Sequence, residues 1–524
     1  MPTGRLVVLG EPGAGKTMLM VRLVLDLLAA RAAGGPVPVL APIASWDPSG
    51  QNLRDWLATR LITDYPALAG PSPAGAAGPT RAAALIEAGL ILPVLDGLDE
   101  IPEKVRGAAI SRINDALPPG GQVLMTCRTL QYRDAVRPPG GPEVTLAGAA
   151  AIQLRPLDAS AVRRYLRDDA PGPAARARWD PVLNLLGTPT PAGQALSTPL
   201  MVALARTIYN PRPGETAGTL RDPAELCGFT SRAAVEAHLF DAFIPAAYRA
   251  AADSGWTAGQ AERWLTFLAR HLEHTIGTPD LAWWQLEKAV SRTALGLGLG
   301  LAAGLAAGLG FGLVAGPGFG LVAGPVFGLV VGLAAGPGVR LGVRPELPAR
   351  GVRISTAGLG FGLVAGLGFG LVAGLAAGLV AGLAAGLAAG LAAGLAAGLI
   401  SVPRDIAGAI DPRMVLARDR QVMLFLTLVA GLGGGLAAGL GAGLGAGLVV
   451  GLGVGLTAGL AVGLDRTRWT SYVLVRGWLA FHRLLPWPLM AFLADAHQRG
   501  VLRQAGATYQ FRHLELQRRL ATRP

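Results

Sequence analysis

One stretch near the start of the chain decides its fold: Gly10-Glu11-Pro12-Gly13-Ala14-Gly15-Lys16-Thr17. It fits the phosphate-binding loop pattern G-x-x-x-x-G-K-[ST] without a mismatch. Glycines let successive backbone N–H groups turn toward a phosphate at the start of the following helix, where the helix dipole favours negative charge. We expect Lys16 to reach the β- and γ-phosphates and Thr17 to help hold Mg²⁺.

The residues around this loop agree with that interpretation. Residues 6–9 are apolar and predict a short buried strand, and residues 18–30 predict an apolar helix. The alternative is a chance glycine-rich turn, since the chain has 75 glycines. Lysine is rare, however, because Lys16, Lys104 and Lys288 are the only lysines. A lysine at the one position that needs a phosphate-binding ammonium favours nucleotide binding.

Composition limits the class of protein. A chain of 524 residues predicts two or three domains. Cys127 and Cys227 are the only cysteines, which excludes a disulfide framework or a metal site built from cysteines. We expect no signal peptide, because the first strand begins close to Met1. The net charge of +12 lies largely beside apolar runs and in the tail, so we expect no nucleic acid partner.

A second strand leads to a group of acids. Residues 90–95 are apolar and run into Asp96-Gly97-Leu98-Asp99-Glu100. Asp96, at the end of the strand, can hold the hydration shell of Mg²⁺ opposite Thr17. Asp99 and Glu100 follow where a carboxylate could orient an attacking water. The alternative for any one of these acids is a solvated loop.

A third strand, residues 122–127, ends at Arg128. Arg128 would lie beside the nucleotide and could sense the γ-phosphate, or it could be an ordinary surface arginine. Strands that alternate with helices predict a parallel sheet whose ligand binds at the carboxyl ends of the strands. The predicted fold class is therefore an α/β P-loop NTPase core.

Three segments together resemble a NACHT domain: G-E-P-G-A-G-K-T, L-P-V-L-D-G-L-D-E-I-P and V-L-M-T-C-R-T. NACHT domains are a branch of the STAND class of signal-transducing NTPases, and this chain resembles a bacterial member over about residues 1–290 and again at its C-terminus. The resemblance implies ATP or ADP with Mg²⁺, slow hydrolysis and homo-oligomerisation on activation. Where related ATPases place Glu directly after the strand Asp, this chain has Gly97, so the catalytic acid would be Asp99 or Glu100.

The resemblance also implies two further nucleotide contacts. The segment L-S-T-P-L resembles the helical domain that follows a NACHT core, and Pro199 would lie near the adenine. Its alternative is an ordinary proline at a helix start. The F-x-H-x-x-x-Q segment of the tail resembles the end of a winged-helix domain, in which His513 would contact the diphosphate of ADP. Arg518 stands where the family usually has an acid, and the alternative is a surface histidine.

Three uncharged blocks, 293–339, 356–401 and 422–464, predict a transmembrane region. Each is long enough for two spans of about twenty residues, which gives about six helices. Arginines flank the blocks, so the positive-inside rule predicts a multi-pass protein of the cell membrane with its NTPase domain and C-terminus in the cytoplasm. The lipid bilayer is thus an expected partner. Glycine and alanine repeated at four-residue spacing suit close helix packing, which leaves an anchor and a pore as alternatives.

The expected domains are an NTPase core at 1–150, a helical domain with the start of a winged helix at 151–292, an all-α transmembrane bundle at 293–464 and a basic tail at 465–524. The predicted function is a membrane-embedded nucleotide switch with weak NTPase activity, in stress or phage defence, whose trigger is unknown. The alternatives are a membrane scaffold with structural nucleotide binding and an ATP-driven transporter. The predicted site residues are, for the nucleotide, Gly10, Glu11, Pro12, Gly13, Ala14, Gly15, Lys16, Thr17, Met18, Arg128, Pro199 and His513; for the metal, Thr17 and Asp96; and for catalysis, Lys16, Asp99 and Glu100.

Overall fold

The computed structural model of this chain describes most of its N-terminal part and parts of its C-terminal region. Described are residues 3–291, 411–442 and 468–523, with short gaps at 74–76, 119, 138–142, 212–219 and 250–254. Residues 352–354, 399–401 and scattered positions between 293 and 325 are also described. The chain divides into two compact units: Met1–Leu265 with Arg499–Val501, and Thr266–Gln498 with Leu502–Pro524.

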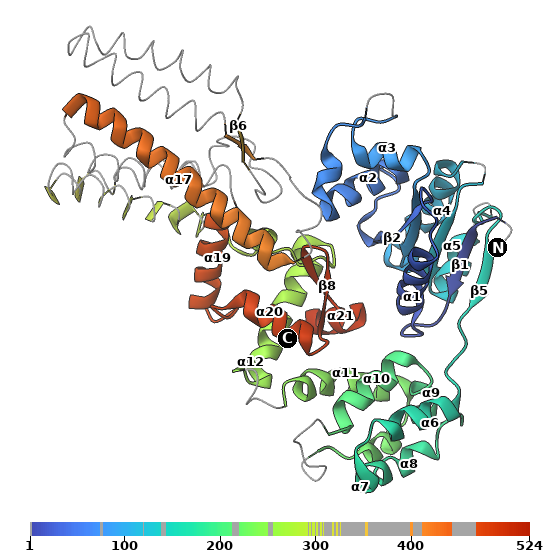
Figure 1. Cartoon of the computed structure of the whole chain (residues 1–524). Coiled ribbons are helices and arrows are strands. Elements are labelled where there is room, and N and C mark those ends of the chain that lie inside the picture. Colours follow the sequence, from blue (N-terminus) through green and yellow to red (C-terminus); the bar gives the residue numbers. More distant parts are fainter. Residues whose placement is uncertain are drawn as a thin grey trace. The chain divides into compact units, whose positions relative to one another are not determined.

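The first unit contains a five-stranded sheet in the order β2-β3-β4-β1-β5 (Figure 1). All of its neighbouring strands pair in parallel. The strands are β1 (Arg5–Leu9), β2 (Val37–Pro42), β3 (Ile91–Asp96), β4 (Val123–Cys127) and β5 (Ala150–Gln153). The helices between them are α1 (Lys16–Ala29), α2 (Leu53–Asp64), α3 (Arg81–Glu87), α4 (Glu103–Ala116) and α5 (Thr129–Val136). Parallel strands require such crossover connections, and the predicted parallel α/β sheet is confirmed.

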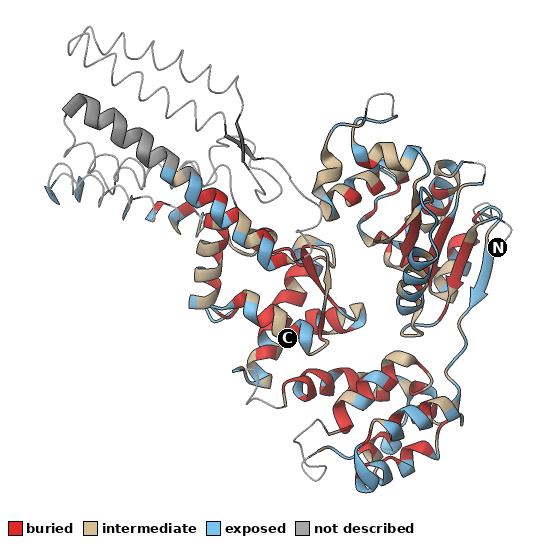
Figure 2. Ribbon diagram, viewed as in Figure 1, coloured by how far each residue is buried: buried red, intermediate tan, exposed pale blue. Residues whose placement is uncertain are grey.

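Side chains alternate between the two faces of this sheet, because successive residues of a strand point to opposite sides. Leu6 and Val8 of β1 pack with Met20 of α1 on one face. Val7 belongs to the core on the other face, with Ile110 of α4. Figure 2 shows β1, β3 and β4 largely buried and the edge strand β5 exposed. Burial of each large aliphatic side chain stabilises the fold by about 1.5–3 kcal/mol.

Helices follow the sheet in the first unit. They are α6 (Ala159–Asp168), α7 (Gly172–Ala177), α8 (Asp180–Leu183), α9 (Pro191–Ala195), α10 (Pro199–Tyr209), the 3₁₀ helix η5 (Pro223–Gly228), α11 (Arg232–Ala247) and the start of α12 (Ala258–Arg270). Polar side chains cap several of them, as Thr198 does for α10 and Ser231 for α11. Each such cap stabilises a helix by about 1 kcal/mol, and α10 therefore begins at a defined residue.

The second unit is largely helical. Its elements are the π-helix η7 (His271–Ile276), the 3₁₀ helix η8 (Trp283–Ala289), α17 (Pro412–Ala442), α19 (Trp469–Phe481), α20 (Leu489–Gln498), α21 (Leu514–Thr522), and the strands β6 (Val352–Ile354), β7 (Leu399–Ser401), β8 (Leu502–Ala505) and β9 (Thr508–Phe511). β8 and β9 form an antiparallel hairpin. Tyr509 also exchanges backbone hydrogen bonds with Leu281, at 2.7 and 3.1 Å. Arg468 and Glu287 form an ion pair at 2.6 Å. These contacts join the tail to the segment before residue 291.

The predicted transmembrane bundle is wrong. Most of residues 293–464, on which that prediction falls, lie outside the described residues. Within the described part of the chain, no helix is both long and apolar enough to cross a membrane. This finding also removes the support for two related predictions. They are the multi-pass location in the cell membrane and the lipid bilayer as a partner.

The error has a physical source in the repeat itself. Leucine supplies the high hydropathy of the G-L-A-A unit, and the prediction counted that hydropathy as helix. Apolar composition over a long block is therefore not enough to predict a spanning helix.

Candidate functional site

The loop between β1 and α1 turns through two glycines in the left-handed backbone region. The φ angle is +73° at Gly13 and +90° at Gly15, where a residue with a Cβ is disfavoured by about 1–2 kcal/mol. A Cβ on Gly13 would also come within 2.8 Å of the Leu200 side chain. These glycines let the loop bring backbone N–H groups to the N-terminus of α1, a position that favours an anion.

Lys16, the first residue of α1, turns its side chain back over the loop. Its Nζ donates to the carbonyl of Gly10 at 2.9 Å and to that of Glu11 at 3.1 Å. Burial lowers the pKa of Lys16, and the negative charge of Asp99 acts against that shift. A phosphate would give this partly desolvated ammonium a charged acceptor, which binds it more strongly than a neutral carbonyl does.

The carboxylate of Asp96 lies buried between two hydroxyl groups. Thr17 Oγ1 donates to Asp96 Oδ2 at 2.8 Å, and Thr126 Oγ1 donates to Asp96 Oδ1 at 2.6 Å. Thr126 in turn accepts a hydrogen bond from the Gly97 N–H at 2.8 Å. The structure thus brings together Thr17 and Asp96, the two residues predicted for the metal, and adds Thr126.

Asp99 and Arg128 form an ion pair beside this cluster. Arg128 Nε lies 2.8 Å from Asp99 Oδ2, and the Arg128 backbone N–H donates to Asp99 Oδ1 at 3.0 Å. The Asp99 side chain is only 8% exposed, so its charge is strongly felt at Lys16. Both carboxylate oxygens of Asp99 are engaged, which hinders this acid from accepting a proton unless Arg128 moves.

Arg106 of α4 fixes the turn that carries the acids. Its guanidinium donates to the carbonyl of Asp99 at 2.9 Å and to that of Ile101 at 2.8 Å. The sequence did not single out Arg106, because an arginine near the start of a helix belongs to no motif by itself. Its contacts become visible only when α4 is placed against the turn.

Gly97, the residue after Asp96, has a backbone conformation and a close contact that both depend on its lack of a side chain. Its φ angle is +86°, and a Cβ at this position would lie 2.8 Å from the Glu100 carboxyl carbon. The Glu100 side chain therefore folds over the backbone of Gly97. A larger residue after Asp96 would push Glu100 away from this position.

The start of α10 lies against the phosphate-binding loop. The Leu200 N–H donates to the Gly13 carbonyl at 3.2 Å. Pro199 Cγ lies 3.6 Å from the point that a Cβ on Gly15 would occupy. The structure thus places Pro199 beside the loop, and its predicted adenine contact stays a prediction. The sequence analysis did not identify Leu200, because a leucine after a proline is typical of an ordinary core position.

Two further residues, Met18 and His513, were predicted to contact the nucleotide. The Met18 side chain is 63% exposed, and its contact with a nucleotide stays a prediction. His513 belongs to the second unit, at the N-terminus of α21. Burial, together with the charges of Arg512 and Arg503, lowers the pKa of His513 to about 4, and the imidazole is uncharged at neutral pH. Its contact with a diphosphate stays a prediction.

The cluster fits a small divalent cation. Mg²⁺ prefers oxygen ligands and is held by one or two carboxylates together with waters and substrate phosphates. Asp96 and Thr17 supply a carboxylate and a hydroxyl within hydrogen-bonding distance of each other, next to the loop. These two residues would hold the ion, which would there neutralise charge on the phosphates.

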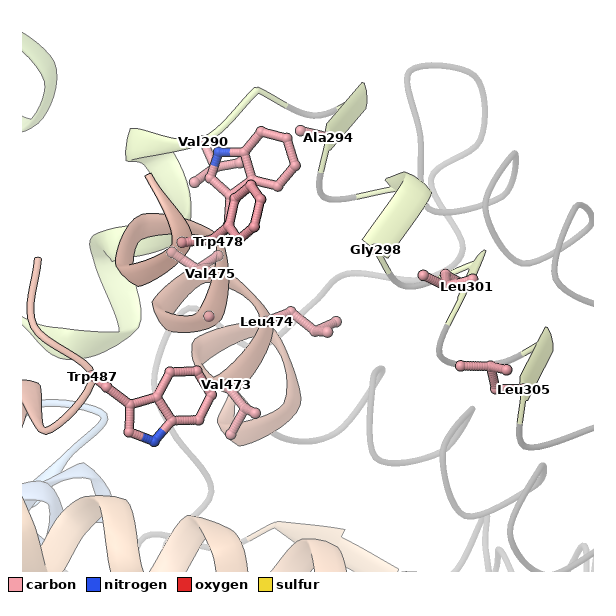
Figure 3. Close-up of a pocket in the computed structure, with 12 residues that line it drawn as sticks. Val290, Ala294, Gly298, Leu301, Leu305, Val473, Leu474, Val475, Trp478 and Trp487 are labelled. Atoms are coloured by element: carbon pink, nitrogen blue, oxygen red, sulfur yellow. The ribbon is translucent and has the colours of Figure 1, made fainter. Parts of the chain in front are cut away.

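A separate groove lies in the second unit, along α19 (Figure 3). Its walls include Val290, Val475, Trp478 and Trp487, and none of its lining residues carries a charge. Such walls suit apolar groups and do not suit a phosphate. The groove is therefore not a candidate phosphate site, and the loop of the first unit stays the predicted one.

Comparison with known proteins agrees with this geometry. Residues 5–171 match the NACHT domain family, a range that includes the loop, the acids after β3 and Arg128. No curated protein matches the chain. Residues 5–171 are thus a NACHT domain, which is a P-loop NTPase module, and this match supports nucleotide binding.

Proposed function

We propose that this chain is a nucleotide-dependent signalling switch, which rests with ADP bound and is activated when ATP replaces it. The observation that supports this proposal most directly is the hydrogen bond from the Leu200 N–H to the Gly13 carbonyl, at 3.2 Å. A nucleotide at the loop acts on the same backbone that α10 contacts. The nucleotide state can therefore be passed to the helices that follow the sheet.

In this proposal the loop and its neighbours divide the work of holding the nucleotide. Lys16 exchanges its two carbonyl acceptors for phosphate oxygens, which strengthens its hydrogen bonds. Thr17 and Asp96 hold Mg²⁺. Pro199 packs near the base, at the side of the loop where it lies beside Gly15.

Arg128 and Asp99 are proposed to distinguish ATP from ADP. The guanidinium that now pairs with Asp99 at 2.8 Å can instead pair with a γ-phosphate, which only ATP provides. While Arg128 engages Asp99, this acid is a poor base, and hydrolysis is slow. Glu100, or Asp99 once released, then orients the attacking water.

The active form is proposed to be an assembly of several copies of the chain, as the resemblance to signalling NTPases implies. The competing hypothesis is that the chain is a scaffold in which the nucleotide is a structural component. The two hypotheses differ in whether ATP and ADP produce different states of the protein.

Nucleotide content of the purified protein tests the first step. We expect the denatured wild type to release ADP on chromatography, and Lys16→Ala to release little. Lys104→Ala is the matched control, because it removes an exposed lysine of α4 that is remote from the loop in sequence. An empty wild type that also fails to bind added ATP or ADP, or equal contents in wild type and Lys16→Ala, would contradict the proposal.

A further inference from the structure

β4 carries a hydroxyl group in the middle of the site. The strand is buried along its whole length, and Thr126 is its only polar side chain apart from the thiol of Cys127. Thr126 is fully buried. In a strand whose other side chains form core, an apolar residue of the same size would fit as well, so the hydroxyl calls for an explanation.

The sheet order places this hydroxyl between the loop and the acids. β4 lies between β1 and β3, and Thr126 is in register with Val8 of β1. Leu124, two residues earlier, belongs to the core on the face that α1 covers. Because side chains alternate along a strand, Thr126 lies on that same face, which also faces the first turn of α1 with Thr17.

The hydrogen bonds around Thr126 have one consistent direction. The Gly97 N–H can only donate, and it donates to Thr126 Oγ1 at 2.8 Å. The single hydroxyl proton of Thr126 is then directed to Asp96 Oδ1, at 2.6 Å. Asp96 Oδ2 is left on the side of Thr17, at 2.8 Å. Thr126 therefore fixes the rotation of the carboxylate and determines which oxygen faces α1.

We propose that Thr126 is a positioning residue for Mg²⁺, which it serves by orienting the carboxylate of Asp96. This inference rests on the proposed nucleotide function. Groups that orient a metal ligand change metal affinity when removed, by about 10- to 100-fold in other proteins. Thr126 does not touch the nucleotide in this proposal, and its removal affects binding only through the metal.

The test measures ATP affinity of the full chain, first in EDTA and then across a Mg²⁺ titration. Thr126→Val removes the hydroxyl at nearly constant volume. We expect about 10-fold more Mg²⁺, or higher, to be needed for the half-maximal gain in ATP affinity, with affinity in EDTA within about twofold of wild type. Thr126→Ser, which keeps the hydroxyl, is expected to titrate like the wild type.

Thr129→Val is the matched control. It makes the same substitution three residues along the chain, where the Thr129 hydroxyl has no hydrogen-bond partner among the described residues, and wild-type behaviour is expected. If thermal melting shows that Thr126→Val is not folded, Thr126→Ala is used in its place.

Three results would overturn the positioning role. They are a wild-type Mg²⁺ midpoint in Thr126→Val, an equal loss in Thr126→Ser, and a parallel loss of affinity in EDTA. A wild type that binds no ATP, or binds it without regard to Mg²⁺, would instead contradict the proposed function itself. The two failures are thus distinguished by the wild type alone.

Discussion

At the scale of single residues, Gly97 combines a backbone requirement with a side-chain requirement. Its φ angle of +86° disfavours any residue with a Cβ, and the space that a Cβ would need is taken by Glu100. We therefore expect Gly97→Ala to destabilise the fold by about 1–2 kcal/mol. We also expect ATP hydrolysis to fall by about 100-fold, because Glu100, which would serve as base, is displaced.

Gly89→Ala separates these two effects. Gly89 also has a positive φ, of +66°, but nothing lies within 4 Å of the point its Cβ would occupy. Chemical denaturation should show a similar loss of stability for both variants, while single-turnover hydrolysis should be slowed only in Gly97→Ala. Equal hydrolysis rates in the two variants would remove Glu100 from the proposed chemistry.

Residues differ in how far the sequence reveals them. The spacing of Lys16, Thr17 and Asp96 carries a known chemistry, so the sequence predicted that Thr17 and Asp96 face each other, as they do at 2.8 Å. Thr126 and Arg106 do not belong to any sequence motif of known spacing. Their contacts depend on the packing of β4 and α4, which is set by tertiary structure and not by local pattern.

At the scale of elements, the N-terminus of α10 is the most informative feature. Thr198 caps the helix by accepting a hydrogen bond from the Met201 N–H at 3.4 Å, and the next two residues lie against the loop. Thr198→Ala is expected to destabilise the protein by about 1 kcal/mol. It should also weaken ADP binding severalfold in titration calorimetry, because the support of Gly13 and Gly15 loosens.

Thr190→Ala is the control for this element. Thr190 caps α9 in the same way, accepting from the Gly193 N–H at 3.3 Å. We expect a similar loss of thermal stability and unchanged ADP affinity. If both variants bind ADP as the wild type does, α10 has no part in holding the nucleotide site.

Elements with strong local patterns were predictable from the sequence. The structure forms β1, β3 and β4 from the apolar runs that precede the loop, the acids and Arg128. The order of the strands was beyond the sequence, because it depends on which apolar faces meet. β5 was not predicted, since its four residues are all exposed and only Ile152 among them is a large apolar residue.

At the scale of the whole molecule, the sequence was informative where its residues are diverse and misleading where they repeat. A varied segment contains positions whose chemistry must agree, such as the loop and the acids after β3. A repeat of glycine, leucine and alanine offers one property, hydropathy, and the membrane prediction relied on it. The match of residues 5–171 to the NACHT domain lies wholly in the varied part.

The central claim is that ATP and ADP produce different states of this chain. The most direct test is hydrogen exchange, followed by mass spectrometry, of the full chain saturated with Mg²⁺ and either ADP or a slowly hydrolysed ATP analogue. We predict different protection in two places, the turn of Asp99 and Glu100 and the N-terminus of α10. Lys16→Ala, which should not retain nucleotide, is expected to show no difference. Identical exchange of the wild type with both nucleotides would contradict the switch and favour a scaffold with structural nucleotide.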